Sequence, residues 1–178
     1  YLKLAPGGYA GTIPTARRSK PKVAVTGGSE PRGQTSAPFQ GVTISQLVKA
    51  KGLDLDHVVE ELGWQDVEVY GTPAIFMPYW DETHVQFQAR YRVGLDRGGR
   101  FLWKKGAKAC LYGLWELERI KKHGFVVLVE GESDYAVLDY RGFPVLAAPG
   151  SSNFKPEWAS LLAGIKDIYA WKEPDQGG

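Results

Sequence analysis

The sequence predicts an α/β protein in which a small helical and antiparallel β part is followed by a parallel sheet. Residues 43–64 contain two short amphipathic stretches, each ended by a glycine. Residues 67–103 are rich in aromatic and β-branched residues with period-two alternation, which is typical of antiparallel strands. From residue 125 onward, apolar strand-like runs alternate with helical stretches, which indicates right-handed crossovers and a parallel, Rossmann-like sheet.

Composition sets broad limits on what the chain can be. Of its 178 residues, 43% are hydrophobic and 24% are charged, which is ordinary for a globular protein. Cys110 is the one cysteine, so the chain can build neither a disulfide framework nor a cysteine-rich zinc site, and no zinc is expected within it. This cysteine usage fits a cytoplasmic location. No apolar run reaches membrane-spanning length and no secretory segment opens the sequence, so no membrane partner is expected.

Residues 1–41 are expected to form a basic, flexible linker or arm. They are rich in Gly, Pro, Ser and Thr and lack apolar periodicity. Residues 1–40 carry six basic residues against the single acid Glu30, a net charge of +5, which leaves −3 for the rest of a chain whose total is +2. A basic arm is compatible with phosphate contacts, although a solvated linker is the simpler interpretation of the composition alone.

A small helical subdomain is expected over residues 42–66. Thr43 is a good N-cap for the stretch ISQLVKAK, which Gly52 ends. A second short helix should follow Asp54 and end at Gly63, with its apolar residues on one face: Val58, Val59 and Leu62.

Residues 67–124 are expected to form an antiparallel β subdomain and a connecting helix. In the strand VQFQARYRV, alternation predicts Val85, Phe87, Ala89 and Tyr91 on one face and Gln86, Gln88, Arg90 and Arg92 on the other. The residues Asp-Arg-Gly-Gly at 96–99 predict a hairpin turn. The connecting helix should run through LYGLWELERIKKH and end at Gly124, with an apolar face formed by Leu111, Leu114, Trp115 and Ile120.

The last part, residues 125–178, alternates regularly. We expect strands over 125–129, 143–147 and 165–171, separated by helices over 134–141 and 155–163.

Acidic residues follow two of these strands. Glu130 and Asp134 come directly after the first strand, and Glu173 and Asp175 follow the third. Because functional groups of open parallel sheets gather beyond the carboxyl ends of the strands, the four carboxylates are expected at one edge. Carboxylates without cysteine favour Mg²⁺ or Mn²⁺ over zinc. Either pair alone could equally be solvated loop residues; both together favour a metal site.

The segments VEGESD and EPDQGG resemble the two signature motifs of the TOPRIM domain, which primases, topoisomerases, OLD-family nucleases and RecR-like proteins share. The resemblance implies that Glu130 acts as a catalytic acid/base or metal ligand and that Asp134 is the trailing acid of the first motif. It also implies that Glu173 and Asp175 bind metal as the two acids of an Asp-x-Asp pair. The first of this pair is Glu here, one methylene longer.

The stretch KGAKACLYGLWELERIKKHGFVVLVEGESD is similar to the segment of DnaG-type primases where a Leu-Tyr-Gly-Leu helix leads into the TOPRIM strand. The preceding QFQARYRVGLDRGGRFLWKKG resembles the basic half of the primase core, which presents Arg and Lys to template and nucleotide. That resemblance implies stacking surfaces at Tyr91 and Trp103. It also implies nucleic-acid or nucleotide contacts by Arg90, Arg92, Arg100, Lys104, Lys105 and Lys108. For any one of these basic residues, an exposed polar sheet face is an equally good interpretation.

The divergence of these motifs resembles primase-like proteins of phages, plasmids and integrated elements. The N-terminal zinc-binding module of those proteins has no counterpart in this sequence, and the TOPRIM unit is incomplete after Gly178. We therefore expect a fragment, inactive by itself, with the third strand uncovered on one face.

The resemblance implies a DNA primase that makes short RNA primers on single-stranded DNA from NTPs with Mg²⁺, served by a fused or separate replicative helicase. Two alternatives stay open. The same carboxylates could activate water in a metal-dependent nuclease. A retained fold could also serve as a non-catalytic nucleic-acid-binding module.

Overall fold

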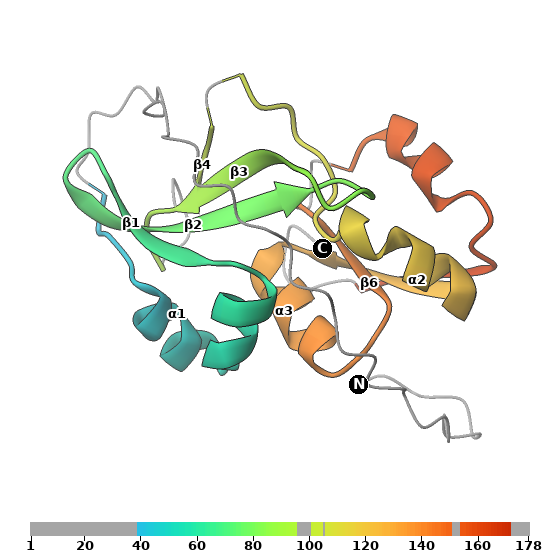
Figure 1. The fold of residues 1–178 in the computed structure, drawn as a ribbon, viewed down its shortest axis with the longest axis horizontal. Helices are drawn as coiled ribbons and strands as arrows, with labels where there is room; N and C mark the ends of the chain where they lie inside the picture. Colours follow the sequence, from blue (N-terminus) through green and yellow to red (C-terminus); the bar gives the residue numbers. More distant parts are fainter. Residues whose placement is uncertain (1–38, 96–100, 105, 151–153, 172–178) are drawn as a thin grey trace.

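The computed structural model describes residues 39–95, 101–104, 106–150 and 154–171, and it confirms the predicted fold class. A four-stranded antiparallel sheet of order β1-β2-β3-β4 lies beside a three-stranded sheet of order β6-β5-β7 (Figure 1). The α1 helix lies beneath the antiparallel sheet, whereas α2 and α3 lie with the second sheet. Most of the predicted arm, residues 1–38, is outside the described residues.

The first helical segment begins and ends where the sequence predicts. The α1 helix spans Ile44–Lys51, and Thr43 and Gln46 form a capping box in which each side chain accepts a hydrogen bond from the other's backbone N–H. Gly52 ends the helix in the left-handed region, at φ 63°. The next turn, η1 (His57–Glu61), is a π-helical turn in which Leu62 N–H donates to the His57 carbonyl. This wider turn exposes Val59, so its predicted place on the apolar face is wrong.

The antiparallel sheet follows as predicted. Its strands are β1 (Gln65–Val69), β2 (Thr72–Trp80), β3 (Gln86–Arg92) and β4 (Phe101–Trp103). The central pair is β2 and β3, which pair antiparallel from Ile75 opposite Arg92 to Trp80 opposite Gln86. The predicted turn at 96–99 lies outside the described residues.

The segment Leu-Tyr-Gly-Leu is not helical, which corrects the prediction. Tyr112 instead forms an isolated antiparallel bridge with Ala147, and two backbone hydrogen bonds of 2.8 and 3.0 Å join them. Gly113 then adopts φ 99°, outside the helical region. Helical structure begins only after it, as a 3₁₀ turn η2 (Leu114–Glu116) that leads into α2 (Leu117–His123). Gly124 ends α2 at φ 77°, as predicted.

The second sheet is parallel, as predicted. The chain forms β5 (Phe125–Glu130), α3 (Glu132–Tyr140), β6 (Val145–Ala148), the 3₁₀ helix η4 (Pro156–Leu162) and β7 (Asp167–Ala170). Both β6 and β7 pair with β5 in parallel register. The β6 strand begins after Pro144, which has no N–H to donate to a neighbouring strand. All four residues of β7 are exposed.

One aromatic cluster joins the two sheets. Tyr112 packs edge-on against Trp115 and Tyr135, with ring centroids 4.9 and 4.8 Å apart. Trp115 also packs edge-on against Trp80 of β2, at 5.0 Å. Because this core contains residues of the helical segment, the antiparallel sheet and the parallel sheet, the parts pack as one unit. No helix among the described residues is long and apolar enough to span a membrane.

Candidate active site

The candidate site begins at the carboxyl end of β5. Glu130 is the last residue of this strand, opposite Ala148 of β6, and Gly131 N–H donates to the Ala148 carbonyl at 2.8 Å. Gly131 turns the chain into α3 with φ 93° and ψ 164°, a conformation that suits glycine. The predicted sharp turn is therefore present, directly after Glu130 at the carboxyl end of β5.

Glu130 is half-buried, and in the described part of the chain its carboxylate has no hydrogen-bond or ion-pair partner. Asp134 is also half-buried, in the first turn of α3. Glu173 and Asp175 lie outside the described residues. Among the residues that are described, no three His, Cys, Asp or Glu side chains are grouped to hold a metal ion. The metal site predicted from the four acids therefore stays a prediction.

Sequence reasoning missed Glu132, which lies between the two predicted catalytic acids. Its side chain is 1% exposed, the Tyr79 hydroxyl donates to Glu132 Oε1 at 2.6 Å, and Arg90 Nη1 donates to both carboxylate oxygens at 3.0 and 3.3 Å. Burial, and secondarily the Glu132 charge, raises the pKa of Tyr79 well above its usual value. Tyr79 therefore stays protonated and acts as a donor to the carboxylate at physiological pH.

The two arginines of β3 are buried rather than exposed. Arg90 is 8% exposed, and its guanidinium lies over the Phe101 ring at 3.9 Å and the Trp103 ring at 5.1 Å. Arg92 is 2% exposed, and Arg92 Nη1 donates to the Ser133 hydroxyl at 3.2 Å. The idea that they lie on an open sheet face is therefore wrong, because the first turn of α3 covers that face.

The alternation predicted for β3 holds only in part. Ala89 and Tyr91 are buried on the face opposite the arginines, but Val85 and Phe87 are exposed near the start of the strand. Tyr91 packs edge-on against Phe76 at 5.7 Å, so it offers no open surface for stacking a base. Trp103 is half-buried and packs against Tyr79 at 5.4 Å.

The other basic residues predicted to contact nucleic acid differ in solvent exposure. Lys108 is exposed and Lys104 is half-buried. Arg100 and Lys105 lie outside the described residues. Of the four predicted contacts that the structure describes, Lys108 is thus the one that lies in solvent.

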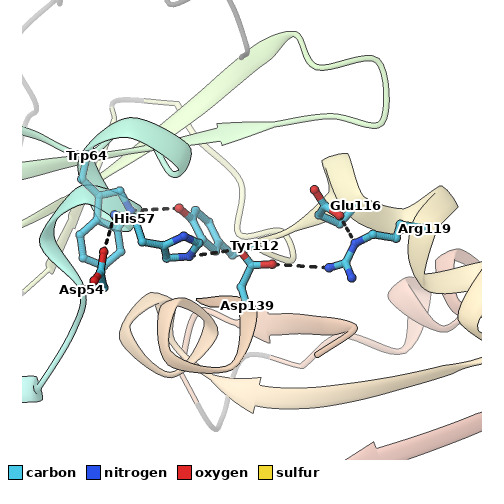
Figure 2. Close-up of polar contacts among 7 residues, drawn as sticks. All are labelled: Asp54, His57, Trp64, Tyr112, Glu116, Arg119 and Asp139. Carbon is cyan, nitrogen blue, oxygen red and sulfur yellow. Dashed lines mark hydrogen bonds and ion pairs between the residues drawn. The ribbon is translucent and has the colours of Figure 1, made fainter. Parts of the chain in front are cut away.

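A second buried network lies at the far end of α3 (Figure 2). Asp139, whose side chain is 0% exposed, sits between His57 Nε2 at 3.2 Å and Arg119 Nη2 at 3.5 Å. Arg119 also pairs with Glu116 through Nε. The α3 helix is therefore held at its C-terminal end to both η1 and α2, and at its N-terminal end to the antiparallel sheet.

Comparison with known protein families finds no match. The Gene 57 protein of Mycobacterium phage D29 is 27% identical over 89 residues, which is 50% of this chain and 57% of that protein. Among solved structures, the primase fragment of the bacteriophage T7 primase-helicase protein is similar, with a TM-score of 0.55, 17% identity, and 83% of this chain and 65% of that one covered.

Two bacterial primases are similar to the same extent. The E. coli primase catalytic core matches with a TM-score of 0.56 and 15% identity over 75% of this chain and 56% of that one. The Aquifex aeolicus primase (zinc-binding and RNA polymerase domains) matches with a TM-score of 0.54 and 21% identity, over 75% of this chain and 43% of that one. The chain thus has the fold of a DnaG-type primase catalytic core, and it spans about half the length of the phage protein that it matches.

Proposed function

We propose that this chain is part of a DNA primase that synthesises short RNA primers on single-stranded DNA from NTPs during replication of a phage or mobile element. One observation carries the proposal: the Glu130 carboxylate, without a described partner, lies at the carboxyl end of β5 in a fold like that of primase catalytic cores. In open parallel sheets this edge is where reacting groups gather. The likeness to a protein of Mycobacterium phage D29 supports the phage context.

The proposal includes a TOPRIM-type Mg²⁺ or Mn²⁺ site. Carboxylate oxygens are the ligands that these cations prefer, and the two Glu130 oxygens have no partner among the described residues. Glu130, Glu173 and Asp175 would hold the metal. Its contribution would be to polarise phosphate oxygens and offset their charge during nucleotidyl transfer.

The chain's own residues would bind and orient the reactants. Among the described members of the proposed basic set, Lys108 is exposed and available to a template or triphosphate, and Lys104 directly follows β4. Arg100 and Lys105 complete the proposed basic set. Glu130 would act as the acid/base group, and Asp134 would support it from the first turn of α3.

The solved structures that are similar to this chain suggest its partners. One similar structure is a DnaG primase catalytic domain bound to ssDNA, with a TM-score of 0.52. The T7 neighbour is a fragment of a primase-helicase protein. We therefore propose a single-stranded DNA template and a replicative helicase, fused or separate.

The test is incubation of the protein, at its full natural length, with single-stranded DNA, labelled NTPs and Mg²⁺. Labelled, RNase-sensitive oligonucleotides that disappear in the Glu130→Gln variant are expected. Divalent-cation-dependent cleavage of the DNA without synthesis would favour the nuclease alternative. DNA binding that neither Mg²⁺ nor Glu130→Gln affects, with no product, would favour a non-catalytic module.

A further inference from the structure

We propose that Arg90 and Arg92 do not contact nucleic acid but fix the first turn of α3, and so act as positioning residues for Glu130 and Asp134. The inference deepens the proposed function and rests on it for the roles of the two acids. The anchoring itself depends only on the contacts between β3 and α3.

The start of α3 has few local contacts that fix its orientation. The residue at its N-cap is Gly131, which has no side chain and makes no capping hydrogen bond. A Cβ added to Gly131 would meet no heavy atom within 4 Å, so no packing confines this residue. Apart from the hydrogen bond from Gly131 N–H to the Ala148 carbonyl, the direction in which the chain leaves β5 therefore depends on contacts made further along.

Residues 132 and 133 make those contacts. The buried Glu132 carboxylate accepts from Arg90 Nη1 at 3.0 Å and from the Tyr79 hydroxyl at 2.6 Å. The Ser133 hydroxyl accepts from Arg92 Nη1 at 3.2 Å. These two residues lie between the catalytic acids proposed here, so any movement of the turn displaces Glu130 and Asp134 relative to each other.

Neither arginine presents an accessible donor group to a template, because both side chains are buried. Arg92 donates through Nε to the Gly94 carbonyl at 3.0 Å and through Nη2 to the Leu95 carbonyl at 3.4 Å. The Arg90 side chain is 10% exposed, and an aromatic ring covers its guanidinium. A phosphate would have to displace buried partners to reach either residue, whereas Lys108 is already exposed.

The first arm of the test measures the anchoring without any assay of activity. The double variant Arg90→Met/Glu132→Gln removes both buried charges together, so it leaves no unpaired charge, and the Gln oxygen can still accept from Tyr79. In hydrogen exchange, the amides of residues 131–135 should exchange about tenfold faster or more, while α1 keeps its protection. Unchanged protection at 131–135 would overturn the proposal.

A matched control acts at the other end of the same helix. His57→Gln/Asp139→Asn also removes a buried pair that ties α3 to another element. It should accelerate exchange near residue 139 and leave residues 131–135 protected. If both double variants loosen α3 uniformly, then β3 has no special role and the proposal fails. Ser133→Ala, which removes one acceptor with little change in size, tests the same turn should the first variant unfold.

The second arm separates positioning from nucleic-acid contact. In Arg90→Met/Glu132→Gln, the salt dependence of single-stranded DNA binding should stay unchanged. Lys108→Ala should instead reduce the slope of log binding constant against log salt concentration by up to about one, the equivalent of one lost phosphate contact. The kcat for primer synthesis should fall tenfold or more with KM for NTPs unchanged. A reduced salt slope in the Arg90 variant would overturn the proposal. If the unaltered protein makes no primer, the proposed function fails, and the exchange experiment still decides the anchoring.

Discussion

The Tyr135 ring of α3 occupies the space that a side chain at position 113 would need. A Cβ built on Gly113 would lie 2.4 Å from Tyr135 Cε2, far inside van der Waals contact. Gly113 also adopts φ 99°, which residues with a side chain rarely adopt. The Leu-Tyr-Gly-Leu segment and the start of α3 therefore pack closely through Gly113 and Tyr135, the residue that follows Asp134.

Gly113→Ala should consequently destabilise the protein by about 3 kcal/mol or more, because backbone strain and overpacking add. Urea denaturation followed by far-UV circular dichroism measures the change. Gly124→Ala is the matched control, since Gly124 has φ 77° but a Cβ there meets nothing within 4 Å. It should cost only about 1 kcal/mol. Equal costs for the two variants would show that the close approach of Tyr135 has no energetic consequence.

The contrast between these two glycines illustrates what the sequence can predict. Thr43, Gly52 and Gly124 act through local rules of helix ends, and the structure has each where those rules place it. The glycine of Leu-Tyr-Gly-Leu acts through a ring that is distant in sequence. The apolar spacing of this stretch therefore predicts a helix start that the structure does not form.

In the candidate site, too, some features follow local sequence rules and others depend on distant contacts. The turn after β5 was predictable because a strand running into Glu-Gly-Glu-Ser-Asp needs a glycine to turn. The burial of Arg90 and Arg92 was not, because alternation assigns side chains to a face without saying what covers it. Nothing in the local sequence distinguishes Glu132 from Glu130. The signal that could have suggested buried acidic and hydroxyl partners is the pair Arg90 and Arg92, two residues apart on one face of a strand.

The Asp139 network yields a second prediction. Asp139→Ala should destabilise the fold by about 1–3 kcal/mol, because it removes the buried carboxylate that lies between the His57 imidazole and the half-buried Arg119 guanidinium (Figure 2). Glu118→Ala is the control: its pair with Lys122 joins two exposed side chains, and its loss should have little measurable effect. Thermal denaturation of both variants distinguishes them, and an Asp139→Ala protein as stable as the control would contradict the account.

The hydrogen bond from Trp64 Nε1 to the Tyr112 hydroxyl, 3.0 Å long and fully buried, ties the helical segment to the Leu-Tyr-Gly-Leu segment. Tyr112→Phe keeps the ring in the aromatic cluster but leaves the indole N–H unsatisfied. A loss of about 1–2 kcal/mol is expected in chemical denaturation. A neutral or stabilising effect would mean that Trp64 finds another acceptor or water.

Alkaline pH should weaken the fold. Burial, and then the nearby Glu132 charge, raises the pKa of Cys110 from 9.0 to about 12, and burial raises the pKa of Tyr112 well above 10.0. Above pH 9 the unfolded chain therefore loses protons that the folded chain retains, so the free energy of unfolding falls as pH rises from 9 toward 12. Cys110→Ala should flatten the decline between pH 9 and 10. Denaturation midpoints that stay constant across this range would contradict the shifts.

The central claim is that the carboxylate at the end of β5 serves primer synthesis. The most direct measurement is the rate of labelled, template-dependent RNA primer formation by the unaltered protein, Glu130→Gln and the surface control Glu118→Gln, each with and without Mg²⁺. Glu118 is 84% exposed on α2 and should be dispensable. The account predicts Mg²⁺-dependent synthesis that Glu118→Gln retains and that Glu130→Gln reduces by about a hundredfold or more. Full synthesis by a correctly folded Glu130→Gln protein would contradict it.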